Sequence, residues 1–156
     1  STDETIYAID GTVLHIYGTH AGATMSGNLE NRLITVVNAS LYLENITVEF
    51  GSALVGGAIA SSSSSLTLNH TSFVGNHAGR TGGALYATDQ STVLFVGEST
   101  RFSNNSAYSS GGALHVAGGS GVSWKGRRTF FTENLSHGDG GAVTIRGETY
   151  ASWSGE

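Results

Sequence analysis

The residues of this chain that are suited to acid–base or metal chemistry are few and scattered. Its aspartates are Asp3, Asp10, Asp89 and Asp139. Enzymes that cleave polysaccharides gather carboxylates around a calcium ion or around the bond to be broken. Asp89 follows one predicted strand and Asp139 precedes another, so the two are expected at different turns. Glu44, Glu98 and Glu133 do not align with one another either. No catalytic residue is assigned, and we expect no enzymatic activity.

The histidines, the basic residues and the overall charge give no stronger signal. His137 and Asp139 lie two apart in a predicted turn, but no third ligand aligns with them, so neither a metal site nor a cofactor is predicted. Arg127 and Arg128 form the core of the one basic cluster, which we interpret as a solvated strand edge. With Lys+Arg 7 against Asp+Glu 12, the net charge is −5, which disfavours nucleic acid as a partner. No apolar run is long enough for a membrane-spanning helix.

Five Asn-x-Ser/Thr triplets are present, and four of them are candidate N-glycosylation sites in a secreted protein. These four are Asn38, Asn45, Asn69 and Asn104. The alternative is that a chain rich in Asn, Ser and Thr forms such triplets by chance. Asn45 and Asn69 are expected at corresponding positions after a strand, and the fifth asparagine, Asn134, is expected to be unmodified. The run Ser61 to Ser65 is expected to be a flexible corner loop, with O-linked sugar as the alternative.

The strongest signal is an internal repeat made of two motifs in phase. A Gly-Gly-Ala-aliphatic tetrad begins at residues 56, 82, 111 and 140, with spacings of 26, 29 and 29 residues. A Phe-x-x-Asn motif begins nine residues before each of the last three tetrads, at Phe73, Phe102 and Phe131. A third column lies eleven residues after the alanine of those tetrads, at Phe95, Trp124 and Trp153.

This repeat predicts an all-β fold, a right-handed parallel β-helix of about five to five and a half coils of 26–29 residues. The apolar runs are short, alternate in polarity and are bounded by Gly, Ser, Asn and Asp, which is typical of strands. A chain of 156 residues without proline suits continuous backbone pairing. We expect one domain over residues 1–156, with degenerate coils in 1–47, well-formed coils in 48–145 and an incomplete terminal coil in 146–156.

Stacked coils assign a structural role to each repeated position. The phenylalanines are expected to form an interior ring column, and Asn76, Asn105 and Asn134 a hydrogen-bonded ladder. The glycines are expected at a corner that requires positive φ or close backbone approach. The predicted glycine ladder is Gly57, Gly83, Gly112 and Gly141, and the predicted aliphatic ladder is Ile59, Leu85, Leu114 and Val143. The alanines between these two ladders are expected to face outward as a flat stripe.

The Gly-Gly-Ala-aliphatic and Phe-x-x-Asn motifs resemble those of the polymorphic outer-membrane proteins of Chlamydia and of similar secreted microbial and protist β-helix proteins. The resemblance covers residues 48–145 well and residues 1–47 loosely. It implies an extracellular, secreted or cell-surface protein with an adhesive or structural role and no catalysis.

The open ends of a β-helix expose unpaired strands. We therefore expect self-association head to tail, as in a filament, or contact with neighbouring coils of a longer chain, and the sequence leaves both alternatives open. Glycans are the other expected partners. The alternative function is a carbohydrate-active β-helix, either a polysaccharide lyase or hydrolase or a glycan-binding module.

Overall fold

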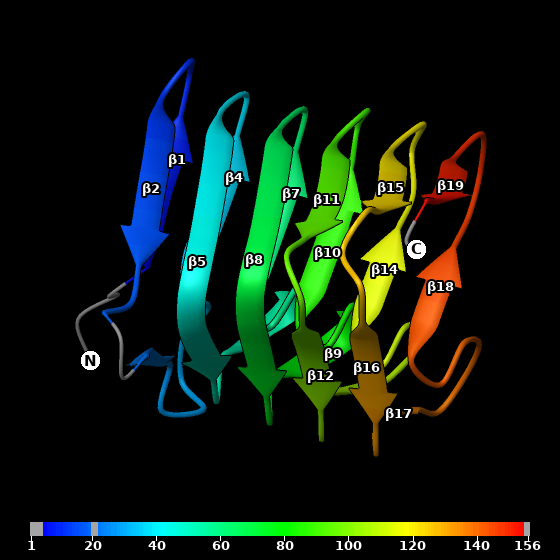
Figure 1. Ribbon diagram of the computed structural model, residues 1–156. Coiled ribbons are helices and arrows are strands. Elements are labelled where there is room, and N and C mark those ends of the chain that lie inside the picture. The colour runs from blue at the N-terminus through cyan, green and yellow to red at the C-terminus, as the bar shows by residue number, and fades with distance from the viewer. Residues whose placement is uncertain (1–4, 20–21, 155–156) are drawn as a thin grey trace.

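The computed structural model describes residues 5–19 and 22–154. Every regular element in these ranges is a β-strand, and the strands pair in parallel. Strands from successive repeats lie side by side, from the blue N-terminal coil to the red C-terminal coil (Figure 1). The predicted all-β parallel β-helix is therefore confirmed.

The first sheet contains the four strands that follow the Gly-Gly-Ala motifs and the corresponding strands of the two preceding coils. Its six strands, in spatial order, are β1 (Ile6–Ile9), β4 (Ile34–Val37), β7 (Ile59–Ser62), β10 (Leu85–Thr88), β14 (Leu114–Val116) and β18 (Val143–Ile145). The aliphatic residues Ile59, Leu85, Leu114 and Val143 are register partners along this sheet. The sequence spacing of the motifs is thus the length of one coil.

The second sheet has nine strands and contributes two segments to each complete coil. Its strands are β2 (Val13–Tyr17), β3 (Ala23–Ser26), β5 (Ser40–Glu49), β8 (Ser65–Val74), β11 (Thr92–Val96), β12 (Thr100–Ser103), β15 (Gly121–Trp124), β16 (Thr129–Thr132) and β19 (Tyr150–Trp153). The third sheet has four strands, which are β6 (Ser52–Val55), β9 (His77–Thr81), β13 (Ser106–Ala107) and β17 (Leu135–Ser136).

The long strands β5 and β8 bend at one residue with a left-handed backbone. This residue is Asn45 in β5, with φ of 51°, and His70 in β8, with φ of 48°. Asn and His adopt this region more readily than most other residues. In the following coils the same path is divided between two shorter strands, β11 with β12 and then β15 with β16.

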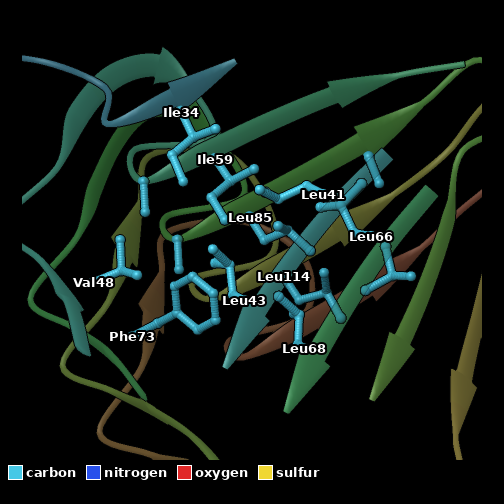
Figure 2. Close-up of a cluster of buried hydrophobic side chains, with 14 of the residues drawn as sticks. Ile34, Leu41, Leu43, Val48, Ile59, Leu66, Leu68, Phe73, Leu85 and Leu114 are labelled. Carbon is cyan, nitrogen blue, oxygen red and sulfur yellow. The ribbon is translucent and has the colours of Figure 1, made fainter. Parts of the chain in front are cut away.

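The core lies between the sheets and consists of columns of like side chains. Figure 2 shows this packing, in which Ile59, Leu85 and Leu114 from the first sheet meet Leu66, Leu68 and Phe73 from the second. These side chains are fully buried, and each contributes about 1.5–3 kcal/mol through its removal from water. The core is continuous from coil to coil because each column continues through the next turn.

The expectation that the motif alanines form an outward stripe is wrong. Ala58, Ala84 and Ala113 are completely buried in the core. The reason is that two consecutive backbone N–H groups share one acceptor: Ala84 and Leu85 both donate to the carbonyl of Ala113, each at 2.9 Å. Regular alternation therefore begins only after the alanine, and the alanine and the residue after it both point inward.

Candidate functional site

The predicted phenylalanines form one interior column. Phe73 and Phe102 stack with ring centroids 4.8 Å apart, and Phe102 and Phe131 with centroids 5.0 Å apart, both at 8° between ring planes. The third predicted column is present too, since Trp124 stacks on Phe95 at 5.6 Å and on Trp153 at 4.8 Å. In this third column, Phe95 pairs in register with Leu68 of the preceding coil.

The asparagine column is a hydrogen-bonded ladder at the bend after the phenylalanines. Asn76 and Asn105 are fully buried. The side-chain nitrogen of Asn105 donates to the side-chain oxygen of Asn134 at 2.9 Å and to the carbonyl of Phe73 at 3.0 Å. Each rung thereby ties two coils together and satisfies a buried backbone carbonyl.

The two glycines of each tetrad serve different needs. The first has positive φ in all four copies, as in Gly82 at 65°. The second, as in Gly83, allows close backbone approach, because a Cβ there would collide with the carbonyl oxygen of Gly112 in the next coil. Gly57 and Gly112 are confined in the same way, by Gly83 and Gly141, whereas a Cβ on Gly141 would meet only the carbonyl oxygen of Asn134, at 3.9 Å.

A second polar ladder, made of serines, was missed by the sequence reasoning. The hydroxyl of Ser64 accepts a hydrogen bond from the backbone nitrogen of Ala39 at 3.1 Å. The hydroxyl of Ser91 accepts one from the backbone nitrogen of Ser64 at 3.2 Å. Ser120 accepts from the backbone nitrogen of Ser91 at 3.0 Å. The spacings of 27 and 29 residues between these buried serines were the available signal.

The serine ladder corrects the expectation for Ser61 to Ser65. Ser61 and Ser64 are buried and hydrogen-bonded, and the Ser61 hydroxyl donates to that of Ser91 at 2.9 Å. Ser62 ends β7 and Ser65 begins β8, so the run is mostly strand and ladder. The expected corner is short, and Ser63 with φ of 50° lies in it.

The candidate glycosylation sites fall into two groups. Asn38 and Asn104 are exposed at positions with positive φ. Asn45 and Asn69 are half-buried, and their side-chain nitrogens donate to the carbonyl of Gly18 and to the carboxylate of Glu44. Asn45 and Asn69 do not correspond in position, because the register partner of Asn69 is Glu44.

Among the described residues, the acidic and basic side chains do not gather in one cluster. Asp89 accepts a hydrogen bond from Ser62 at 2.8 Å, and Asp139 forms an exposed ion pair with Arg146. Residues 5–19 and 22–154 contain no group of three or more His, Cys, Asp or Glu side chains arranged to hold a metal ion. Asp3 lies outside the described residues. Lys125, Arg127 and Arg128 are exposed.

The surface best suited to a ligand is the outward face of β2, β5 and the first half of β8, here called the aromatic face. It consists of His15, Tyr17, Tyr42, Glu44, Thr67 and Asn69. The rings of His15 and Tyr42 stack at 4.4 Å with 12° between their planes. Glu44 accepts a hydrogen bond from Asn69 at 3.1 Å. Aromatic rings and planar polar groups therefore lie on adjacent coils.

Two open depressions lie at opposite ends of this face. One, of about 430 Å³, is lined by Tyr17, Gly18, Thr19, Glu44 and Asn45. The other, of about 370 Å³, lies at the turn from the first sheet to the second and is lined mainly by Ser, Thr, Asn and Gln side chains from coils one to four. Both depressions are open to solvent.

Residues 70–88 and 99–117 match the family model described as the Chlamydia polymorphic membrane protein (Chlamydia_PMP) repeat. Two segments of the chain are thus similar to polymorphic membrane protein repeats. Comparison with curated proteins and with solved structures found no match. Among the described residues, no helix is long and apolar enough to cross a membrane.

The two matched segments coincide with the structural ladders. The first spans Phe73, Asn76 and the tetrad from Gly82, and the second spans Phe102, Asn105 and the tetrad from Gly111. The resemblance predicted from these motifs is thereby confirmed. The aromatic face lies mostly N-terminal to both segments, so the repeat match describes the scaffold and does not extend to this face.

Proposed function

We propose that this protein is a non-enzymatic, surface-exposed β-helix with a structural and adhesive role. The observation that supports this most is the agreement between the repeat match and the ladders: the repeated residues form the interior, which leaves only the outer faces for contacts. The family is described as a membrane protein family, which supports a place at the cell surface or outer membrane. Secretion and glycans on Asn38 and Asn104 belong to this proposal, because both asparagines are exposed.

The end coils are proposed to be covered by further coils, either from a second copy stacked head to tail or from neighbouring parts of a longer chain. At one end Trp153 is 71% exposed, although it continues an otherwise interior column. At the other end Leu14, Ile16 and Met25 are partly buried and pack against the core. Apolar columns that continue to both ends support coverage by similar coils, since open strands template pairing.

Surface exposure is tested by labelling intact cells that produce the protein with an antibody raised against residues 1–156. We expect labelling before permeabilisation. Labelling only after permeabilisation would contradict the proposed location. Adhesion is tested with beads coated with the chain, which should attach to cell or matrix surfaces more than beads coated with an unrelated acidic protein. Equal attachment would contradict the adhesive role.

Stacking is tested by size-exclusion chromatography and negative-stain microscopy of the purified chain. Head-to-tail pairing of copies predicts rods that lengthen with protein concentration. A Trp153→Asp variant should shorten them, because the charge would be buried without a partner at the new interface. Monomers at every concentration would favour neighbouring coils of a longer chain over a filament.

A further inference from the structure

We propose that the aromatic face of β2, β5 and β8 binds neutral oligosaccharides. This inference rests on the proposed adhesive role and names the ligand class for it. Sugar rings present apolar C–H faces and a rim of hydroxyl groups, so a sugar-binding surface needs an aromatic ring with an open face and planar hydrogen-bonding groups beside it.

Tyr42 supplies the open ring face. One side of its ring is covered by His15 of the preceding coil. On its other side the register partner is Thr67, whose short side chain does not cover a phenol ring. Tyr42 remains 40% exposed even though its strand lies between two others. Tyr42 therefore presents exposed ring surface beside the short side chain of Thr67, and a sugar stacked on this ring would bury apolar surface on both partners.

Glu44 and Asn69 supply the hydrogen-bonding groups next to the Tyr42 ring. They lie two residues after Tyr42 and Thr67 on the same strands and the same face. Their mutual hydrogen bond fixes both side chains before a ligand arrives, which lowers the entropic cost of binding. A carboxylate can accept several hydrogen bonds. Among the described residues, Asn69 donates one hydrogen bond to the Glu44 carboxylate, which leaves acceptor positions for sugar hydroxyl groups.

The charge of this face selects against acidic sugars. None of β2, β5 and β8 contains Lys or Arg, while β5 contains both Glu44 and Glu49. An anionic sugar would meet repulsion from these carboxylates and no Lys or Arg side chain from these three strands. Neutral sugars require no cation, because hydroxyl groups can both donate to Glu44 and accept from amides.

The dimensions of the face suit a short oligosaccharide. The four residue steps from Val13 to Tyr17 span about 13 Å at the usual strand rise. The depressions at the two ends of the face continue this length, one with Tyr17, 74% exposed, and the other with Ser40 and Thr92. A linear ligand can therefore lie along the strands with its middle over Tyr42 and its ends in the two hollows.

The proposal is tested by NMR titration of the ¹⁵N-labelled chain with cellotetraose, chitotetraose, maltotetraose and mannotetraose, with tetragalacturonate as the acidic counterpart. We expect at least one neutral tetrasaccharide to shift amide signals of β2, β5 and β8, and tetragalacturonate to shift none. The Tyr42→Ala variant should lose roughly tenfold or more in affinity, as for an aromatic contact at the centre of an interface. Tyr42→Phe should keep most of it, because the ring remains.

Tyr108→Ala is the matched control, because Tyr108 is also an exposed tyrosine stacked on a histidine, His137, but directly follows β13 of the third sheet. It should bind like the parent chain. In the Glu44→Gln variant, the difference in affinity between neutral tetrasaccharides and tetragalacturonate should become smaller, because the repelling charge is removed while the shape of the side chain remains. Amide spectra of each variant report directly whether the fold is intact.

Three outcomes would overturn the inference. They are the absence of shifts with all four neutral sugars at millimolar concentration, shifts confined to another face, and equal binding by the Tyr42→Ala variant. The bead assay separates this inference from the proposed function: beads that attach equally well with the parent and Tyr42→Ala chains would leave adhesion standing without this site. Beads that never attach, although the sugar binds, would contradict adhesion alone.

Discussion

The side-chain oxygen of Asn105 accepts two hydrogen bonds from Asn76, one from the backbone nitrogen and one from the side-chain nitrogen, both at 3.0 Å. The two residues are 29 positions apart and belong to adjacent coils. Asn76 in turn accepts from the backbone nitrogen of Gly51 and donates to the carbonyl of Val48. One buried amide per coil thus fixes the bend of two coils at once.

Asn105→Ala is expected to destabilise the chain by several kcal/mol. The substitution removes the acceptor of the buried backbone nitrogen of Asn76 and of one hydrogen of its side-chain amide, at about 1–3 kcal/mol each. Urea unfolding followed by circular dichroism measures the change. The control is Asn104→Gly, next in sequence but exposed, where glycine accepts the φ of 55° and stability should stay within about 0.5 kcal/mol. Similar losses in both variants would contradict the ladder.

The repeated columns were predictable because stacking converts sequence spacing directly into contact. Two motifs in phase over three coils fix which residues lie above one another, so the ring column of Phe73, Phe102 and Phe131 follows from spacing alone. The glycine roles follow as well, since a corner against a neighbouring backbone excludes a Cβ. None of this depends on knowing the sheet geometry in detail.

Gly83→Ala is expected to destabilise the chain far more than Gly79→Ala. A Cβ on Gly83 would collide with backbone carbonyls of Gly112 and Ser106, which have no room to move. A Cβ on Gly79 would come no closer than 3.6 Å, to a methyl group of Leu54, and that glycine has no left-handed φ. Gly79→Ala should therefore be neutral or stabilising by about 0.4–1 kcal/mol. Thermal unfolding of the two variants measures this, and equal melting temperatures would contradict the close approach.

Local irregularities and unrepeated contacts were not predictable in the same way. The inward turn of Ala84 depends on a carbonyl that accepts two consecutive donors, which period-two alternation does not anticipate. The serine ladder was hidden because Ser64 stands inside a run of five serines, which as a composition indicates a loop. The aromatic face combines His15, Tyr42 and Asn69, which share a face only through a register that becomes visible in three dimensions.

Ala84→Val is expected to cost about 1–3 kcal/mol, the usual range for inserting methyl groups into a packed core. Ala84 is fully buried between Ala58 and Ala113 of adjacent coils. The control is Ala60→Val on the outward side of β7, where the side chain is only half-buried and valine favours a strand. Denaturant unfolding should separate the two variants. If Ala60→Val were the more damaging one, the orientation of the alanine column would be contradicted.

Trp124→Phe is expected to change stability by about 1 kcal/mol or less, whereas Trp124→Ala should cost about 3–5 kcal/mol. The indole nitrogen of Trp124 is buried without a hydrogen-bond partner among the described residues. Phenylalanine removes that unsatisfied donor and keeps a ring stacked between Phe95 and Trp153. Chemical unfolding monitored by circular dichroism measures both changes. A large loss in the phenylalanine variant would indicate that the indole nitrogen has a partner after all.

Stability is expected to fall on acidification because of His115. Its side chain is 6% exposed, stacks on Tyr86 and lies 3.2 Å from the hydroxyl of Ser110. Burial, and secondarily the charge of Arg146, lowers the pKa of His115 below its ordinary value of 6.5. The unfolded chain then binds a proton that the folded chain refuses, so the free energy of unfolding decreases as the pH falls below about 6.5 and is fully retained above it.

The measurement is urea unfolding at intervals between pH 5 and pH 8. His115→Phe keeps a ring against Tyr86 and should flatten the pH dependence, because the titrating group is gone. His137→Phe is the matched control, since His137 also stacks on a tyrosine, Tyr108, but is exposed. It should leave the slope unchanged. The expected result assigns the acid sensitivity to the buried His115. If His137→Phe flattened the curve and His115→Phe did not, the acid sensitivity would belong to the exposed histidine instead.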